Sequence, residues 1–519
     1  MQPTPKLGPV TRRTAVILIA IVVTGVLGRM YHLQSPLSGY RPNDTAAIAR
    51  NFYEHGMRIL YPQIDWRGNS TGYVESEFQL YSFTAASLYQ MFGEHDVIGR
   101  GLSIVAYALS ALLLFALVRR LADEATGLLA AFFYSMATIA FYYTRSFQPD
   151  ATLALGSLAG IYYFWKWTEE RSLLALAVSA AGVCIAVLIK PTNLYLGLPL
   201  LYLAYRAFGL GFLRRVEIWI FALAVTVPAA LWYRHAYQFW VHDGNTFGVF
   251  GGWVKYKAFP PDRSLAWDAA KAIVKRVFVL MATPAGCLLL LVGLLKRPAS
   301  RNFVLHWWCV GFGVAAVVAA KGMEAHDYYQ LPMVFFVAAW MALGTMALWN
   351  AEFLPRKLLR AAVVVIGASV LGYSLWRWEI KLTQWEVGTQ PKELDRVEFA
   401  QRVSQLTEPD AMIIMVRPYR GVPSLYQHRT AQGEHLECDP VDFYRSHRIG
   451  WSLDDRLARL AFIDTLRGRG ARYFATAFPE LLALHPELKT GLDSLYTPLE
   501  VNEHWAIYRL ERLPVRAGS

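Results

Sequence analysis

Charged residues are scarce in this sequence. Asp, Glu, Lys and Arg make up only 17% of its 519 residues, whereas hydrophobic residues make up 55%. In a soluble protein, charged residues usually make up about a quarter of the chain. The low charge therefore predicts a membrane protein with a polar remainder.

Cysteines are few, and nucleotide-binding motifs are missing. The four cysteines form no C-x-x-C pair, and three of them lie in apolar runs. This pattern argues against a disulfide framework or a zinc knot. The sequence also contains no G-x-G-x-x-G fingerprint and no P-loop, so it predicts no nucleotide site.

The positive charge of the chain does not indicate nucleic acid as a partner. The net charge is +12, but Lys and Arg gather at the ends of apolar runs, where they orient membrane spans. No basic patch with interleaved aromatic residues stands out. We therefore expect membrane lipids, and not nucleic acid, as partners.

Eleven apolar runs predict an α-helical polytopic membrane protein. Several of them approach the roughly 20 residues that a spanning helix needs. The first run follows basic residues and is not followed by a small-residue cleavage site, so we expect an uncleaved span. The runs cover about 15–27, 101–118, 126–143, 150–167, 173–189, 193–208, 217–234, 276–295, 302–320, 328–349 and 358–376.

Basic residues between these runs predict the orientation. With the N-terminus in the cytoplasm, the Arg119–Arg120 pair and three later basic loops all fall on the cytoplasmic side, as the positive-inside rule requires. We therefore expect a multi-pass protein of the cytoplasmic (inner) membrane. The same threading puts two large loops, 34–100 and 235–275, and everything after the last span on the periplasmic side.

The pattern changes after residue 377. Long apolar runs give way to short strand-like and helix-like segments, which are typical of a small α/β domain. The predicted organisation is a transmembrane domain at 1–377 and an extracytoplasmic α/β domain at 378–519. Within the latter, strands are predicted at 411–416, 472–477 and 505–510, and a helix at 454–467.

The first outer loop holds the densest group of candidate functional residues. Pro42-Asn43-Asp44 opens a predicted amphipathic helix with Ile48 and Phe52 on one face and Gly56 at its C-terminal cap. We expect this helix to lie on the membrane surface. Carboxylates and aromatic side chains crowd the rest of the loop, up to Leu80, so chemistry is predicted here.

Five short motifs carry a resemblance to a known family. They are D-x-x-x-I-A-R-N-F-Y-E-x-G at 44–56, Y-V-E at 73–75, Y-x-x-F-G at 89–93, S-F-Q-P-D from Ser146 to Asp150, and H-D-Y-Y-Q-L-P at 326–332. In this order the chain resembles a GT-C glycosyltransferase of the protein O-mannosyltransferase and aminoarabinose (lipid A) transferase group. The resemblance covers roughly 14–350.

Two departures from related families stand out. Relatives often place a Lys after the loop Glu, where it can face a lipid phosphate, but this chain has Ser76 there. The W-W-D signature of oligosaccharyltransferases is missing, because Trp307-Trp308 is followed by Cys309. The asparagine-glycosylating branch is therefore disfavoured.

The resemblance implies a hexosyl or pentosyl transferase that uses a polyprenyl-phosphate-linked sugar as donor and a glycan, lipid or protein as acceptor. Asp44 would be the general base of an inverting single displacement, and Asp150 a second catalytic residue. Cations would hold the departing phosphate. The candidate substrate-binding residues are Glu75, Arg145, Lys190, His326, Tyr328 and Tyr329.

Each of these residues also has a structural interpretation. Asp44 could cap its helix, and Asp150 could complement the dipole at the start of the fourth span. Lys190 could complement a helix C-terminus, Arg145 could anchor the third span, and Tyr328 and Tyr329 could belong to an interfacial aromatic belt. Glu75 could be a solvated loop charge.

No cofactor is required by these residues. A divalent cation shared by Asp44 and Asp150 stays an open alternative, because two carboxylates do not specify a metal.

Two other classes of function remain open. A transporter or flippase of lipid-linked sugars would be expected to carry polar residues at span centres and an inverted repeat, but no repeat is evident here. A non-catalytic scaffold would not need acidic residues on one membrane face. The sequence favours the enzyme over both.

Overall fold

The computed structural model describes residues 8–249, 263–297, 300–383, 391–418, 427–429, 435–437 and 439–513. The chain divides into two compact units, neither of which is continuous in sequence. Unit 1 comprises Met1–Leu33, Val97–Trp232 and Val254–Leu382, and unit 2 comprises Gln34–Asp96, Tyr233–Trp253 and Thr383–Ser519.

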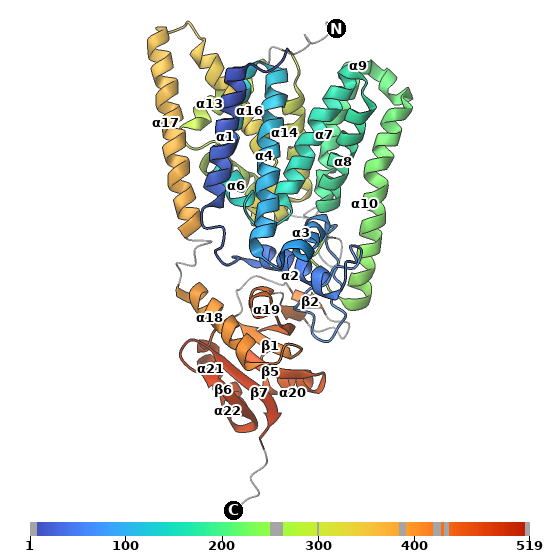
Figure 1. Cartoon of the computed structure of the whole chain (residues 1–519), viewed down its shortest axis with the longest axis vertical. Helices are drawn as coiled ribbons and strands as arrows, with labels where there is room; N and C mark the ends of the chain where they lie inside the picture. The colour runs from blue at the N-terminus through green and yellow to red at the C-terminus, as the bar shows by residue number, and fades with distance from the viewer. Residues whose placement is uncertain are drawn as a thin grey trace, which may run out of the picture. The chain divides into compact units, whose positions relative to one another are not determined.

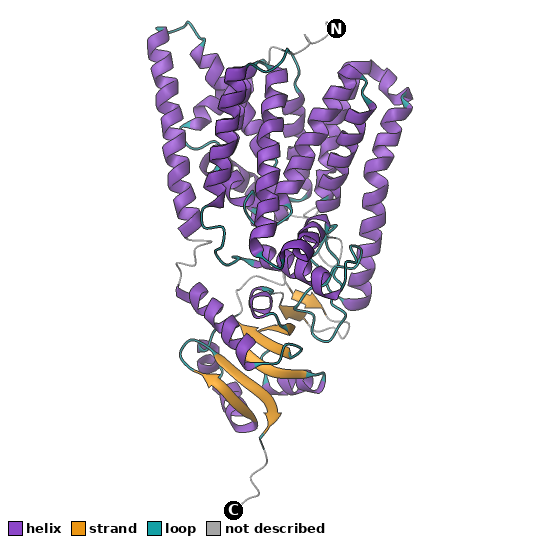
Figure 2. Ribbon diagram, viewed as in Figure 1, coloured by secondary structure: helices purple, strands orange, loops and turns teal. Residues whose placement is uncertain are grey.

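All regular secondary structure in the described residues of unit 1 is helical (Figures 1 and 2). Its α-helices are α1 (Arg12–Met30), α4 (Asp96–Leu121), α5 (Glu124–Met136), α6 (Thr138–Tyr143), α7 (Asp150–Glu170), α8 (Leu173–Ile189), α9 (Gly197–Phe208), most of α10 (Val216–Asp243), α12 (Arg263–Arg276), α13 (Gly286–Leu295), α14 (Val304–Val318), α15 (Ala320–Ala325), α16 (Met333–Trp349) and α17 (Arg356–Lys381). Short helices of other types are η1 (Pro191–Leu196), η2 (Gly209–Arg214), η3 (Val277–Met281) and η4 (Asp327–Gln330).

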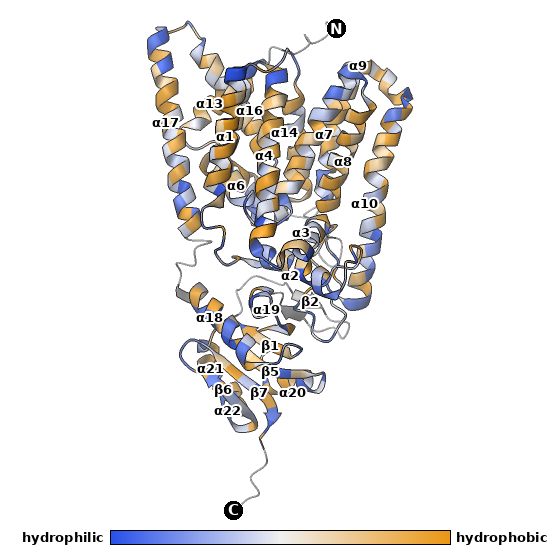
Figure 3. Ribbon diagram, viewed as in Figure 1, coloured by the Kyte–Doolittle hydropathy of each residue, from blue (hydrophilic) through white to orange (hydrophobic). Residues whose placement is uncertain are grey.

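Several of these helices have the length and apolarity of membrane spans (Figure 3). Within the described residues five qualify, or six if one bent pair counts as a span. Three shorter apolar helices, α8, α14 and α16, add to them. The chain is therefore a multi-pass membrane protein, and the count of eleven spans stays a prediction.

One predicted span is broken. The run at 276–295 is divided between Ser264–Met281 and Gly286–Leu295, which meet at an angle of 114°. Thr283 at the break has a φ of 69°, and Pro284 follows it. Proline lacks the backbone N–H that a continuous helix would use, so this run forms two helices and not one continuous helix.

Small residues allow close packing inside unit 1. A Cβ at Gly156 of α7 would lie 2.6 Å from the carbonyl oxygen of Gly182 on α8. The two helices therefore approach with their backbones nearly in contact, as small residues permit between membrane helices. This packing fixes Asp150 at the start of α7 relative to Lys190 at the end of α8.

Unit 2 is built on a five-stranded mixed sheet in the order β4-β1-β5-β7-β6. The three strands β4, β1 and β5 are parallel, whereas β7 and β6 are antiparallel to their neighbours. The sheet strands are β1 (Met412–Arg417), β4 (Ile449–Asp454), β5 (Ala471–Thr476), β6 (Tyr496–Val501) and β7 (Ala506–Arg512). The separate pair β2 (Gln427–Arg429) and β3 (His435–Glu437) is antiparallel.

The helices of unit 2 lie on both faces of this sheet. They are α2 (Tyr40–His55), α3 (Leu80–Phe92), α18 (Pro391–Leu406), α19 (Val441–Ser446), α20 (Leu460–Gly468), α21 (Glu480–Leu484) and α22 (Pro486–Leu495). The three predicted strands are confirmed within one or two residues as β1, β5 and β7. The helix predicted at 454–467 begins only at Leu460, because strand β4 and a turn take up the preceding residues.

The two faces of the sheet bury different parts of the chain. Alternate residues of β1 point to opposite faces, as in any strand. Ile414 and Val416 pack with residues of α20, α21 and α22. Ile413 and Met415 pack with α18 and with the first outer loop, including Ile48, Phe52, Ile64 and Trp66. The loop is therefore an integral layer of this unit.

The prediction that α2 rests on a membrane surface is wrong. Ile48 and Phe52 form the predicted apolar face, but they are buried in a protein core together with strand residues from the end of the chain. The helix also begins at Tyr40, not at Pro42. The predicted C-terminal cap is confirmed, because Gly56 ends the helix with a φ of 105°.

Candidate active site

Asp44 lies inside α2 and does not cap it. The N-cap is Gly39, which precedes Tyr40 and makes no side-chain capping bond. The half-buried Asp44 carboxylate instead accepts a hydrogen bond of 2.8 Å from the indole nitrogen of Trp66. Its other oxygen, Oδ2, has no hydrogen-bond partner among the described residues. The capping alternative is therefore excluded.

Three other carboxylates in unit 2 raise the pKa of Asp44, and each is paired with arginine. Asp65 pairs with Arg50 at 2.5 Å. Arg41 of α2 pairs with Glu77 at 2.9 Å, and Arg417 pairs with Asp439 at 2.6 Å. Asp44 has no such arginine partner within the described parts of the chain.

This environment makes Asp44 a stronger base than an ordinary carboxylate. Burial raises the pKa of Asp44 well above its usual range, and the charges of Asp65, Asp439 and Glu77 raise it further. The hydrogen bond from Trp66 acts in the opposite direction. A carboxylate with a raised pKa accepts a proton more readily, which is what a general base requires.

Glu75 is buried in unit 2 and is not a solvated loop charge. Its side chain is fully covered and accepts a hydrogen bond from the Thr246 hydroxyl. Its backbone carbonyl accepts from the amide of Phe247 at 2.8 Å. Ser76, which replaces the lysine of relatives, is also buried and donates to the carbonyl of Glu77 at 3.0 Å.

In unit 1 several predicted residues form one cluster. Lys190, directly after α8, forms a buried ion pair with Asp150, the first residue of α7. The Lys190 ammonium lies 4.4 Å from the ring centroid of Tyr328 and 4.3 Å from that of Tyr329. The ring of His326 stacks on both tyrosines.

Arg145 donates hydrogen bonds to the C-terminal end of α1. Its guanidinium is buried and donates to the backbone carbonyl of Arg29 at 2.9 Å and to that of Tyr31. These carbonyls at a helix C-terminus otherwise lack partners. The contacts favour the anchoring interpretation, and a role for Arg145 in phosphate binding stays a prediction.

Asp44 belongs to unit 2 and Asp150 to unit 1. A cavity shared by the two carboxylates, and a metal ion held between them, therefore stay predictions. Lys190 already neutralises Asp150, so a metal at Asp150 would have to displace or share that ammonium.

Sequence patterns do not reveal how Trp66, Arg417 and Asp439 contribute to the surroundings of Asp44. The bond from Trp66 depends on a turn that no periodicity predicts. Arg417 and Asp439 come from the C-terminal part of the chain, far from Asp44 in the sequence. Arg417 is a buried arginine at the end of the apolar strand β1, and this position is the one indication of its role.

The chain resembles several known glycosyltransferases. The family model for dolichyl-phosphate-mannose-protein mannosyltransferases matches residues 79–232. ArnT from Cupriavidus metallidurans bound to undecaprenyl phosphate is 14% identical with a TM-score of 0.60, and the match covers 98% of this chain and 100% of that one. The chain has a GT-C glycosyltransferase fold of the mannosyltransferase and ArnT type. The predicted resemblance is confirmed.

Two further structures share this GT-C fold. ArnT from the same organism in the apo state has a TM-score of 0.64 at 13% identity, and the match covers 97% of this chain and 100% of that one. The oligosaccharyltransferase of Archaeoglobus fulgidus in its apo form has a TM-score of 0.56 at 10% identity, with 93% of this chain and 73% of that one covered. No curated protein matches the sequence at a significant level.

Proposed function

We propose that this chain transfers a hexosyl or pentosyl group from a polyprenyl-phosphate-linked donor to an acceptor hydroxyl on the outer face of the membrane. One observation carries the proposal. Asp44 is a half-buried carboxylate with a raised pKa, and it is held by a single described hydrogen bond from Trp66. The GT-C fold adds the donor class, because a structural relative is described as bound to undecaprenyl phosphate.

In the proposed reaction the Asp44 carboxylate removes the proton of the acceptor hydroxyl. The acceptor oxygen attacks the anomeric carbon from the face opposite the phosphate. The bond between that carbon and the phosphate oxygen breaks, and its electron pair leaves with the polyprenyl phosphate. A single displacement of this kind inverts the anomeric centre.

The proposed donor site lies at the cluster around Lys190. The Lys190 ammonium lies beside two tyrosine rings and the buried Asp150 carboxylate. It could bind the oxygens of a lipid phosphate while weakening its ion pair with Asp150. Tyr328 and Tyr329 would add hydroxyl donors, and His326 would hold their rings in place by stacking. Asp150 would keep the ammonium oriented while the site is empty of phosphate.

The acceptor site is proposed near Asp44 and Glu75, both in unit 2. Burial of Glu75 against Thr246 fixes the second large outer loop to the first. We place the acceptor, a glycan, lipid or protein, on the outer side because the basic loops predict that orientation.

Mass spectrometry of envelope lipids and glycans tests this function. A strain that lacks the protein should lose one glycosylated species, and the wild-type gene but not Asp44→Asn should restore it. A carrier of lipid-linked sugars predicts a different result, because Asp44→Asn would restore the species as well as the wild type does.

A further inference from the structure

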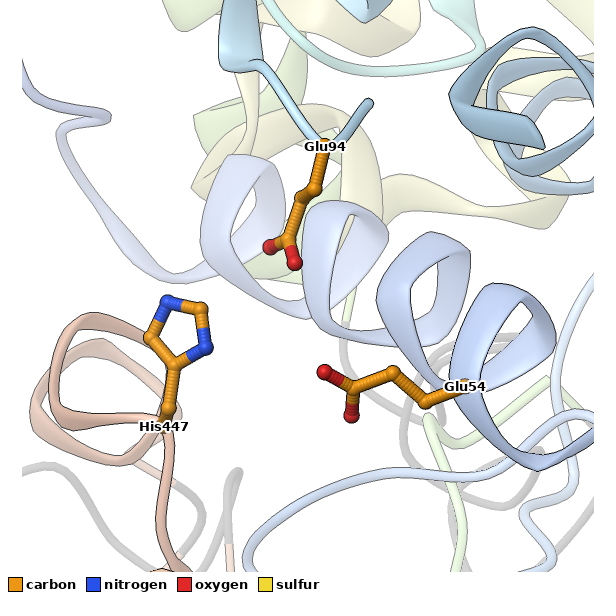
Figure 4. A group of neighbouring side chains, drawn as sticks. All are labelled: Glu54, Glu94 and His447. Atoms are coloured by element: carbon orange, nitrogen blue, oxygen red, sulfur yellow. The ribbon is translucent and has the colours of Figure 1, made fainter. Parts of the chain in front are cut away.

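Three potential metal ligands converge in unit 2, near the ion pair of Arg50 and Asp65 (Figure 4). Glu54 comes from the last turn of α2, Glu94 from the connection between α3 and α4, and His447 from the residue that ends α19. One ligand atom from each lies within 4.8 Å of the others. Figure 4 shows both carboxylates and the imidazole pointing toward a common centre.

These three side chains make no hydrogen bond or ion pair with each other or with other described residues. Their charged neighbours, in contrast, have partners. Arg50 donates to Asp65 and to the carbonyl of Tyr444, and Asp96 accepts from the Tyr444 hydroxyl at 2.6 Å. Internal bonding therefore does not explain why the three groups face one another.

The cluster combines two carboxylates with one imidazole, and the nearby guanidinium of Arg50 is already paired with Asp65. A neutral imidazole offers a nitrogen lone pair to a metal ion. A divalent cation would compensate the two carboxylates and accept that lone pair.

We propose that Glu54, Glu94 and His447 bind one divalent cation, with Zn²⁺ the best fit. Carboxylate oxygen and imidazole nitrogen are both common zinc ligands, at about 2.0–2.2 Å from the metal. In a tetrahedral site such ligands stand about 3.4 Å apart, so the three groups need only small rotations of two long glutamate side chains. Water would occupy the fourth position.

This site would be structural. Glu54 lies ten residues after Asp44 on α2, which corresponds to about 15 Å along a helix axis. The metal would join the end of α2 to the end of α19 and to the connection that follows α3, all within unit 2. It would thus hold the helix that carries Asp44 against the sheet domain, separate from the metal predicted between Asp44 and Asp150.

Two substitutions test the site without disturbing the fold. Glu54→Gln keeps the size of an exposed side chain and removes its charge. His447 has a φ of 54°, in the left-handed region that asparagine tolerates better than most residues. His447→Asn therefore removes the imidazole while keeping the backbone conformation. Glu398→Gln, an exposed carboxylate on α18, serves as the matched control.

The measurement is a titration of the full-length, chelator-treated protein in detergent with Zn²⁺ alone, followed by a competing chromophoric chelator. We expect one equivalent to bind tightly to the wild type and to Glu398→Gln, and to raise their thermal unfolding midpoints. Glu54→Gln and His447→Asn should bind at least tenfold more weakly and lose that shift. An absence of tight binding in the wild type, or unchanged binding in both variants, would overturn the proposal.

Discussion

The indole N–H of Trp66 donates a 2.8 Å hydrogen bond to Oδ1 of Asp44. This bond joins the loop to the helix across 22 positions of the sequence. It fixes one oxygen of the carboxylate, while the other has no hydrogen-bond partner among the described residues. The arrangement suits a base that must keep its orientation and still reach an acceptor hydroxyl.

Replacing Asp44 with asparagine should abolish transfer and leave the protein folded. Loss of a general base lowers the rate typically by about 10²- to 10⁴-fold. Because the folded state raises the pKa of Asp44, its charge destabilises the fold above the ordinary carboxyl pKa, and neutral Asn should not lower the unfolding midpoint. Turnover and thermal unfolding of Asp44→Asn and Asp44→Ala in one detergent check this. More than about half of wild-type turnover in the Asn variant would exclude Asp44 as base.

Trp66→Phe should move the acidic limb of the pH–rate profile to higher pH. The indole hydrogen bond lowers the pKa of Asp44, so its loss raises that pKa further and protonates the base at pH values where the wild type is active. The rate should fall most at low pH and recover as the pH rises.

A matched variant distinguishes this effect from a general loss of packing. Trp505 makes an equivalent bond of 2.9 Å to Glu500 in the same unit. Trp505→Phe should leave the profile of kcat/KM against pH unchanged. Equal shifts in both variants would show that Trp66 does not act through Asp44.

Lys190→Met should destabilise unit 1 strongly, because it leaves the Asp150 charge buried without its ammonium partner. Removing one member of a buried ion pair typically lowers the free energy of unfolding by about 3–5 kcal/mol. Adding Asp150→Asn should restore most of that stability, as thermal unfolding of the single and double variants can measure.

Activity of the same double variant separates a binding role from a structural one. If Lys190 holds the donor phosphate, Asp150→Asn with Lys190→Met stays inactive and binds polyprenyl phosphate weakly despite its recovered stability. Restored turnover would instead mean that the pair serves packing alone.

A reporter enzyme that is active only in the cytoplasm should be silent when it is fused after Ser519. Eleven spans from a cytoplasmic N-terminus place the C-terminus outside. The same reporter fused in the connection at 351–355, just before α17, should be active. Cytoplasmic activity after Ser519 would contradict the orientation and the outer position of Asp44.

The sequence predicts local structure correctly where its pattern is compatible with only one structure. The buried strands β1, β5 and β7 were predicted from short apolar segments, and Gly56 was predicted as a cap because a left-handed position favours glycine. The sequence marks Lys190 and Asp150 as candidate site residues but does not predict that they pair. Periodicity does not reveal that α7 and α8 approach closely through glycine.

Other features were not accessible in this way. The spacing of Ile48 and Phe52 is the same whether lipid or protein covers them, so the pattern could not identify their partner. The break at 276–295 had a local signal in Pro284, but the length of the apolar run outweighed it. The pair of Arg417 and Asp439 lies far from Asp44 in the sequence, and no local pattern predicts that Asp439 contributes to the surroundings of Asp44.

The shared core of unit 2 also constrains the order in which the protein can be completed. Ile48, Phe52 and Trp66 are synthesised well before Ile413, Trp505 and Ile507, against which they pack. While the intervening helices are translated, the apolar face of α2 lacks the sheet that covers it in the folded protein. Such a nascent chain offers a natural target for chaperones, and any premature stop codon before the sheet would leave that face uncovered for quality control to detect.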